Sequence, residues 1–368
     1  MLVHILTKGF NSPNGASFLF PLLHHRKYLQ EIGIKFQLFY QDSSKLKECD
    51  IVILESKYYS QRWSIEKNRI LEEIKSYKTS SNKVFYFDIN DSAGWPHASA
   101  LPYVDGYFKN QLFKDKTLYT KPLYGHRLYT DYYYRQYQIE DQIPIIQETI
   151  PLNDISKLSI GWNSGLGNYS YSGPYLTHFY RYFPWSIFIR YSTNFHSPET
   201  IRPRNVSCRM GTQYARHSVA WQRLQIQALL QPYMAIQKVT RRAYYRELKQ
   251  SKYVISPFGL GEITLKDFET FMAGAVLVKP SLDTMETWPD FYQANKTYVP
   301  FKWDLSDLSD LIEKMIANPS LYQDIAKQGQ DLYRQYTVGF DAAEYFAHHF
   351  TKLLSFNAKE NNVTEYLA

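Results

Sequence analysis

The chain has 368 residues, 44% hydrophobic and 21% charged, which excludes a disordered chain and allows two domains with their own cores. The formal net charge is +7 with scattered basic residues, so we expect no nucleic-acid partner, because nucleic-acid-binding proteins usually concentrate this charge in a stripe. Two cysteines, Cys49 and Cys208, exclude a disulfide framework and fit a reducing compartment.

Strands and helices alternate along the first 115 residues, which is typical of a parallel sheet with helices on both faces. The sequence predicts strands at 2–6, 35–40, 50–54 and 84–89, helices at 18–32 and 65–77, and a turn-rich loop at 11–17. Residues 115–150 break this alternation, and we interpret them as the connection to a second domain.

The alternation then starts again. We predict strands at 158–162, 186–191, 253–255 and 276–278, and helices at 219–230, 243–249, 265–273, 308–316, 321–333 and 341–354. The pattern indicates an α/β fold of two β/α domains facing a cleft, the first over 1–150 and the second over 151–335. Residues 336–368 would form a last helix and a polar tail.

One stretch, residues 256–278, combines features that suit a phosphate ligand. It reads SPFGLGEITLKDFETFMAGAVLV, a strand end, a glycine-rich turn and a helix. Glycines let backbone N–H groups approach a ligand, and a helix N-terminus attracts anions. Lys266 would add a positive charge, and Glu269, one turn further, would accept ribose hydroxyls. The simpler alternative is a plain loop followed by an exposed Lys–Glu helix pair.

The wider stretch resembles the donor-binding segment of GT-B glycosyltransferases, closest to the exostosin-like and spore-maturation-like group and bacterial polysaccharide glycosyltransferases. The resemblance covers about residues 200–335 and is carried by the Ser-Pro strand end, the glycine loop, a basic residue before Glu269, and Gly274. It implies two Rossmann-like domains, an acceptor site in the first and a nucleotide-sugar site in the second. It also implies that the last helix crosses back to the first domain.

The resemblance assigns donor contacts to a set of residues around this loop. They are Gly259, Gly261, Glu262, Thr264, Lys266 and Glu269, with Arg209 and Arg223 stabilising the departing diphosphate. Many retaining members carry Glu-x7-Glu across this loop, but here the first position is Gly261 and Glu262 is out of register. The stereochemical course therefore stays open.

An inverting transferase needs a general base near the acceptor hydroxyl. Asp91 and His97 follow the strand predicted at 84–89 and are the best placed candidates by sequence. The alternative for Asp91 is that it simply forms a turn after the strand.

We therefore predict a glycosyltransferase that moves a sugar from a nucleotide-diphosphate sugar to a glycan or lipid-linked acceptor. The family resemblance places this reaction in bacterial surface polysaccharide synthesis, such as that of lipopolysaccharide, O-antigen or capsule. The alternatives are a non-catalytic nucleotide- or glycan-binding protein and a nucleotide-sugar epimerase. We expect no metal and no cofactor besides the nucleotide-sugar co-substrate, because metal-binding spacings are absent from the sequence.

Neither a signal peptide nor an apolar run of about 18 residues is present in the sequence. We therefore expect a cytoplasmic protein whose contact with a membrane would be peripheral, at the inner face of the cell membrane.

Overall fold

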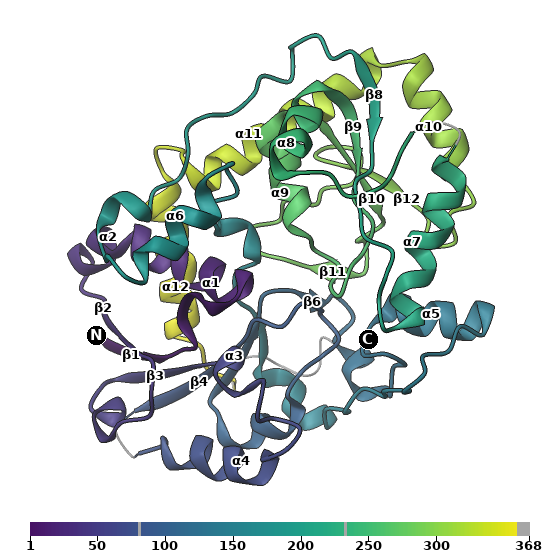
Figure 1. Ribbon diagram of the computed structural model, residues 1–368. Helices are drawn as coiled ribbons and strands as arrows, with labels where there is room; N and C mark the ends of the chain where they lie inside the picture. Colours follow the sequence, from purple (N-terminus) through teal and green to yellow (C-terminus); the bar gives the residue numbers. More distant parts are fainter. Residues whose placement is uncertain (80–81, 232–233, 359–368) are drawn as a thin grey trace.

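The computed structural model describes residues 1–79, 82–231 and 234–358, and it shows an α/β protein with two parallel sheets (Figure 1). Among these residues the first sheet has six strands. Their spatial order is β2 (Lys35–Phe39), β1 (Leu2–Leu6), β3 (Ile51–Glu55), β4 (Lys83–Asp88), β5 (Gly106–Lys109) and β7 (Leu158–Ile160). Every residue of β3 is buried, as expected for a central strand covered on both faces.

The second sheet has four parallel strands in the described chain. Their spatial order is β12 (Val299–Phe301), β10 (Val276–Pro280), β9 (Ser251–Ile255) and β8 (Arg204–Ser207). Two parallel α/β sheets meeting at a cleft confirm the predicted GT-B-like fold class. Strand β1 and the helix following β9 begin and end where the sequence predicts.

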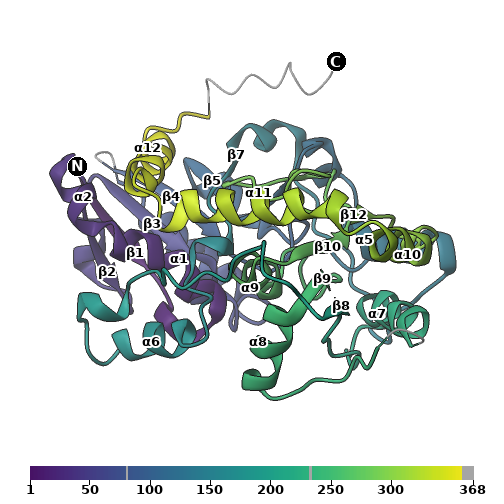
Figure 2. The same ribbon diagram turned by 90° about the horizontal axis from the view of Figure 1, so that it is seen from above.

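The helices cover the sheets and connect the domains. Their bounds are α1 (Pro13–His24), α2 (Arg26–Glu31), α3 (Ser56–Tyr59), α4 (Lys67–Ser76), α5 (Leu128–Tyr137), α6 (Gly173–Tyr180), α7 (His217–Leu230), α8 (Arg241–Gln250), α9 (Leu265–Ala273), α10 (Leu308–Ala317), α11 (Ser320–Thr337) and α12 (Ala342–Leu354). In Figure 2, α11 runs across both domains towards α12.

Two features join the domains. Strand β6 (Leu112–Phe113) pairs antiparallel with β11 (Met285–Glu286), which makes a small ribbon between the two halves of the chain. Helix α12 lies against the first domain, where the ring of Phe346 contacts those of His25 and Trp162 at centroid distances of 5.6 and 5.4 Å.

Several predicted elements differ in the structure. The strand predicted at 158–162 is β7, and it pairs with β5 in the first sheet although the predicted boundary lies at residue 150. The second sheet begins instead at β8, whose polar sequence RNVS gives no apolar signal. The strand predicted at 186–191 is a short 3-10 helix, η7 (Ser186–Phe188), outside both sheets.

The loop predicted at 11–17 is largely the start of α1. Pro13 occupies the first turn, where its missing N–H costs nothing, and the Ser12 hydroxyl caps the helix by accepting from the Gly15 N–H at 3.0 Å. The helix predicted at 18–32 is divided at His25 into α1 and α2. Residues 359–368 of the predicted polar tail lie outside the described residues.

Candidate functional site

The strand order of the first sheet fixes the position of the main cleft. The chain continues from β1 to β2 on one side and from β3 to β4 on the other, so the strand order reverses between β1 and β3. Open α/β sheets bind ligands at such a switch point, beyond the carboxyl ends of the strands. A cavity of about 520 Å³ lies there. Asn14 after β1 and Lys57 after β3 line one side, and Arg223 and residues 259–261 and 263–265 of the second domain line the other. We call this cavity the cleft.

The glycine-rich loop between β9 and α9 passes close to the first domain at the cleft. A Cβ atom on Gly261 would lie 1.8 Å from the backbone oxygen of Asp91, so no larger residue fits without moving backbone. Gly261 is also the position where Glu-x7-Glu enzymes carry their first glutamate. The close approach of the two domains at this point leaves no room for that side chain.

Helix α9 starts with a capping box. The Thr264 hydroxyl and the Asp267 carboxylate each bond to the other residue's backbone at the helix start. Asp267 is buried and forms an ion pair with buried Lys279, at 3.2 Å between Nζ and Oδ2. This pair fixes the helix N-terminus beside the cleft, which Thr264 lines directly.

Glu262 does not line the cleft, and its contact with the donor stays a prediction. Its carboxylate is buried and accepts hydrogen bonds from Ser92 Oγ at 3.0 Å, the Ala93 N–H at 3.2 Å and Gln111 Nε2 at 3.1 Å. All three donors belong to the first domain. Burial raises the pKa of Glu262. Glu262 therefore anchors the glycine loop to the first domain.

Two further side chains from the connection between the domains hold the same loop. Arg127 Nε donates to the Leu260 carbonyl at 2.6 Å, and the Tyr129 hydroxyl donates to the Gly259 carbonyl at 2.6 Å. Both side chains are buried. The conformation of the loop thus depends on both domains.

A second cavity, of about 350 Å³, adjoins the cleft and is rich in positive charge. Four basic side chains line it: Arg209, Arg223, Lys238 and Lys266. No carboxylate belongs to its lining in the described part of the chain. The cavity also reaches Thr264 at the start of α9. We call it the basic hollow, and its charge and helix end suit a phosphate group.

Arg223 connects the basic hollow to the cleft because it lines both. Its Nε donates to the Phe258 carbonyl at 2.6 Å and its Nη1 to the Gly211 carbonyl at 3.0 Å, while Nη2 faces Gly259. Desolvation lowers the pKa of Arg223 and of Lys266. An anion bound here would oppose that shift and be held more strongly than in water.

Arg209 is already engaged by a carboxylate. Its Nη2 lies 2.7 Å from Glu247 Oε2, and its Nε bonds to both oxygens of that carboxylate at 3.0 Å. Its backbone carbonyl accepts from the Lys266 ammonium. The structure therefore brings Arg209 to the basic hollow, where its positive charge is paired with the Glu247 carboxylate.

Lys266 and Glu269 lie on one helix but line different cavities. Glu269 accepts from the hydroxyls of Tyr244 and Tyr245, each at 2.9 Å, and lies 3.9 Å from Arg241. It lines a cavity of about 360 Å³ that does not include Lys266. Burial raises the pKa of Glu269. Ribose binding by Glu269 stays a prediction.

The two predicted catalytic residues lie in different surroundings. Asp91 lines the cleft, where its Oδ1 accepts a hydrogen bond from Asn14 Nδ2 at 2.7 Å. Among the residues that the structure describes, it is the one carboxylate in the lining of the cleft. His97 is buried in the first domain, stacked on Trp63 at 3.9 Å and 2.6 Å from the Tyr86 hydroxyl. Its pKa is lowered to about 4 by desolvation. His97 does not line the cleft, and its catalytic role stays a prediction.

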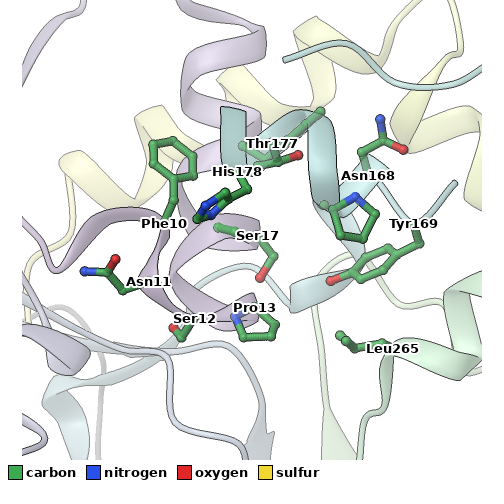
Figure 3. A pocket seen from close by; sticks show the side chains of 14 residues that line it. Phe10, Asn11, Ser12, Pro13, Ser17, Asn168, Tyr169, Thr177, His178 and Leu265 are labelled. Carbon is green, nitrogen blue, oxygen red and sulfur yellow. The ribbon is translucent and has the colours of Figure 1, made fainter. Parts of the chain in front are cut away.

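A third cavity, of about 240 Å³, adjoins the cleft on the side of α1 and α6 (Figure 3). It is largely apolar, with Phe10 beside His178 on one side and Tyr169 and Leu265 on the other. Ser12, Pro13 and Leu265 line both this cavity and the cleft. We call it the apolar hollow.

Sequence reasoning singled out the loops around the cleft but missed the individual polar residues Asn14, Lys57 and Gln111. The signal that could have found them is the position of each after a strand of the first sheet. No such signal marks Lys238, which follows no predicted strand.

Two further findings concern metals and membranes. Among residues 1–79, 82–231 and 234–358, no group of three or more His, Cys, Asp or Glu side chains is arranged to hold a metal ion. No helix in these ranges is both long and apolar enough to cross a membrane.

Comparison with known proteins gives distant structural likenesses. No protein-family model and no curated protein matches the chain. Anabaena HepE in complex with UDP-glucose is 10% identical, with a TM-score of 0.44 over 96% of this chain and 99% of that one. A glycosyltransferase from Rickettsia africae is 10% identical, with a TM-score of 0.43 over 98% and 99%. S. aureus MnaA with UDP is 8% identical, with a TM-score of 0.39 over 96% of each chain.

Proposed function

We propose that this protein is a glycosyltransferase that takes its sugar from a nucleotide-diphosphate donor. The observation that carries the proposal is the basic hollow at the N-terminus of α9. It adjoins the cleft at Arg223, which lines both cavities, and among the described residues Asp91 is the one carboxylate that lines the cleft. A diphosphate in the hollow would leave the sugar in the cleft, between the two domains. Enzymes of this kind need such a separation of an anion site from a site for the acceptor.

Each residue has a proposed role in the transfer. Lys266 and Arg223 hold the diphosphate and stabilise the negative charge that develops as it leaves. Asp91 takes the proton of the acceptor hydroxyl, whose oxygen forms a bond to the anomeric carbon. The bond from that carbon to the phosphate oxygen breaks, and its electron pair leaves with the nucleoside diphosphate. The positive side chains supply charge stabilisation without a metal ion.

The acceptor would enter on the side of the first domain. The apolar hollow borders the cleft there, and its mixed lining of aromatic rings, hydroxyls and amides suits a sugar ring. We propose a glycan or lipid-linked acceptor. The resemblance of residues 200–335 supports a role in bacterial surface polysaccharide synthesis.

Ligand binding tests the donor site directly. We expect one nucleoside diphosphate from a panel to raise the melting temperature of the wild-type protein, and Lys266→Ala to bind it roughly tenfold to a hundredfold more weakly, because a charge-assisted contact is lost. Lys327→Ala on the exposed face of α11 is the matched control and should behave as wild type. No response to any nucleoside diphosphate by a folded protein would contradict the proposal.

Turnover then separates the transferase from its alternatives. The wild-type protein should consume the nucleotide sugar much faster with an acceptor glycan than without it. Conversion of the donor sugar without acceptor would indicate an epimerase, and tight binding without any turnover would indicate a binding protein.

A further inference from the structure

The segment from α6 to η7 exposes an unusual number of large apolar side chains. Six of them are between 49% and 61% exposed: Tyr175, Phe179, Tyr182, Phe183, Trp185 and Ile187. We call this set the aromatic surface. In Figure 2, α6 lies at the lower left margin of the molecule, outside α1.

Helical spacing and ring contacts bring these side chains together in two groups. Tyr175, Phe179 and Tyr182 follow each other at helical spacing, so they share one side of α6 and its extension. Phe188 joins the rest, with ring centroids 6.2 Å from Phe179 and 5.9 Å from Trp185. Phe183 lies 5.4 Å from Trp185. Contiguous exposed apolar surface of this kind marks an interaction site.

The charged side chains of the segment that carries the aromatic surface are of one sign. No Asp or Glu occurs between residues 155 and 198, whereas Arg181 and Arg190 lie within this segment and are exposed. Burial raises the pKa of Tyr180 at the end of α6, and the nearby positive charge of Arg26 on α2 acts in the opposite direction. The surface is therefore apolar and positively charged.

This combination favours an anionic membrane over a second copy of the chain. In a symmetric dimer the same patch faces itself, so Arg181 and Arg190 would approach their own kind with no carboxylate of residues 155–198 to pair with them. Aromatic rings with flanking arginines are instead the chemistry of a lipid interface, where rings enter the headgroup layer and arginines bind anionic lipids.

We propose that the aromatic surface binds the interface of an anionic membrane, with Trp185 and Phe179 inserted among the headgroups. The bound protein lies on the bilayer and does not span it. This inference stands apart from the proposed transfer reaction, and its test measures no turnover. If the transfer reaction also holds, α6 would lie between the bilayer and the apolar hollow, which it lines through Pro174, Thr177 and His178, and a lipid-linked acceptor would be held close to that hollow.

Vesicle flotation tests the proposal on the full chain. Wild-type protein should float with vesicles of phosphatidylcholine and phosphatidylglycerol in equal parts, bind phosphatidylcholine alone far less, and lose binding as salt rises. The variant Phe179→Ser/Trp185→Ser/Ile187→Ser should not float. Arg181→Gln and Arg190→Gln should each weaken binding about fivefold, the usual contribution of one basic residue at an anionic surface.

Fluorescence locates the contact. Lipids with brominated acyl chains should quench a tryptophan signal in the wild type, and Trp185→Phe should keep vesicle binding while losing the quenching. Phe340→Ser, at a fully exposed phenylalanine outside the segment, is the control and should bind and be quenched as wild type.

Three results would overturn the proposal. The first is that the wild-type protein binds neither vesicle type. The second is that the folded triple variant binds vesicles as the wild type does. The third is that the wild type is a dimer and the triple variant a monomer, while neither protein binds vesicles.

Discussion

The backbone oxygen of Asp91 occupies the place that a side chain on Gly261 would need, with only 1.8 Å to an ideal Cβ. One residue lines the cleft from the first domain, and the other belongs to the glycine loop of the second. The contact therefore joins the two domains at the cleft itself, and its geometry depends on the absence of a side chain at position 261.

Gly261→Ala should destabilise the protein by about 1–3 kcal/mol, because backbone must move on one side of the contact. Urea unfolding measured by fluorescence gives the shift in midpoint. Gly259→Ala is the matched control, since a Cβ there lies 3.2 Å from Arg223 Nη2, the end of a side chain that can adjust. Equal stability of both variants would show that the domains separate easily at this point.

Glu269→Ala should weaken binding of the nucleoside diphosphate roughly tenfold and leave inorganic pyrophosphate binding unchanged, if the carboxylate accepts ribose hydroxyls. Calorimetry with both ligands measures the difference. Tyr244→Phe is the control, because it removes one hydrogen bond to Glu269 and keeps the carboxylate. An equal loss of affinity for both ligands would show that Glu269 instead supports the packing of α8 against α9.

Asp91→Asn should lower kcat about 100- to 10,000-fold with little change in KM for the donor, because the base is lost while the basic hollow is intact. The melting temperature should change little, since the asparagine carbonyl still accepts from Asn14 Nδ2. Steady-state kinetics at saturating donor measures the effect. A kcat within a few-fold of wild type would remove Asp91 from the proposed mechanism.

His97 should affect stability and its pH dependence, not the chemical step. Its pKa is about 4 in the folded protein and about 6.5 when unfolded, so between these values the unfolded chain binds more protons. Stability therefore falls as the pH decreases from about 6.5 to about 4, by up to about 1.4 kcal/mol per pH unit for this group.

His97→Gln tests this effect in urea unfolding between pH 7 and pH 4.5. The variant should be less stable at pH 7, because the stack on Trp63 is lost, and its stability should depend less steeply on pH. His178→Gln, at an exposed histidine, should leave the profile unchanged. An unaltered slope in the folded His97 variant would show that another buried histidine dominates.

Many strands and helices could be predicted because the apolar pattern and end residues that mark each one lie within or next to it in the sequence. The buried strand Leu2–Leu6 and the helix Leu265–Ala273 have clear apolar patterns, and Thr264 and Gly274 mark the ends of that helix. Strand β8 was missed because only half of its residues are buried, and its place in the sheet is set by pairing with β9.

The candidate site shows the same division. The sequence predicted that Lys266 and Arg223 would bind an anion, and both line the basic hollow, whose lining contains no carboxylate among the described residues. Sequence could not predict that Glu262 bonds to Ser92 and Gln111, because those partners lie some 150–170 residues away.

The sequence by itself determined the α/β class, the strand–glycine loop–helix unit and the chemistry available at its start, since backbone freedom, capping and periodicity act over a few neighbouring residues. Only the tertiary structure decided which side chains reach the cleft. Packing within the first domain buried His97 against Trp63, whereas Asp91, six residues earlier in the chain, lines the cleft between the domains. Burial depends on contacts between distant segments, and these exist only once the chain has folded.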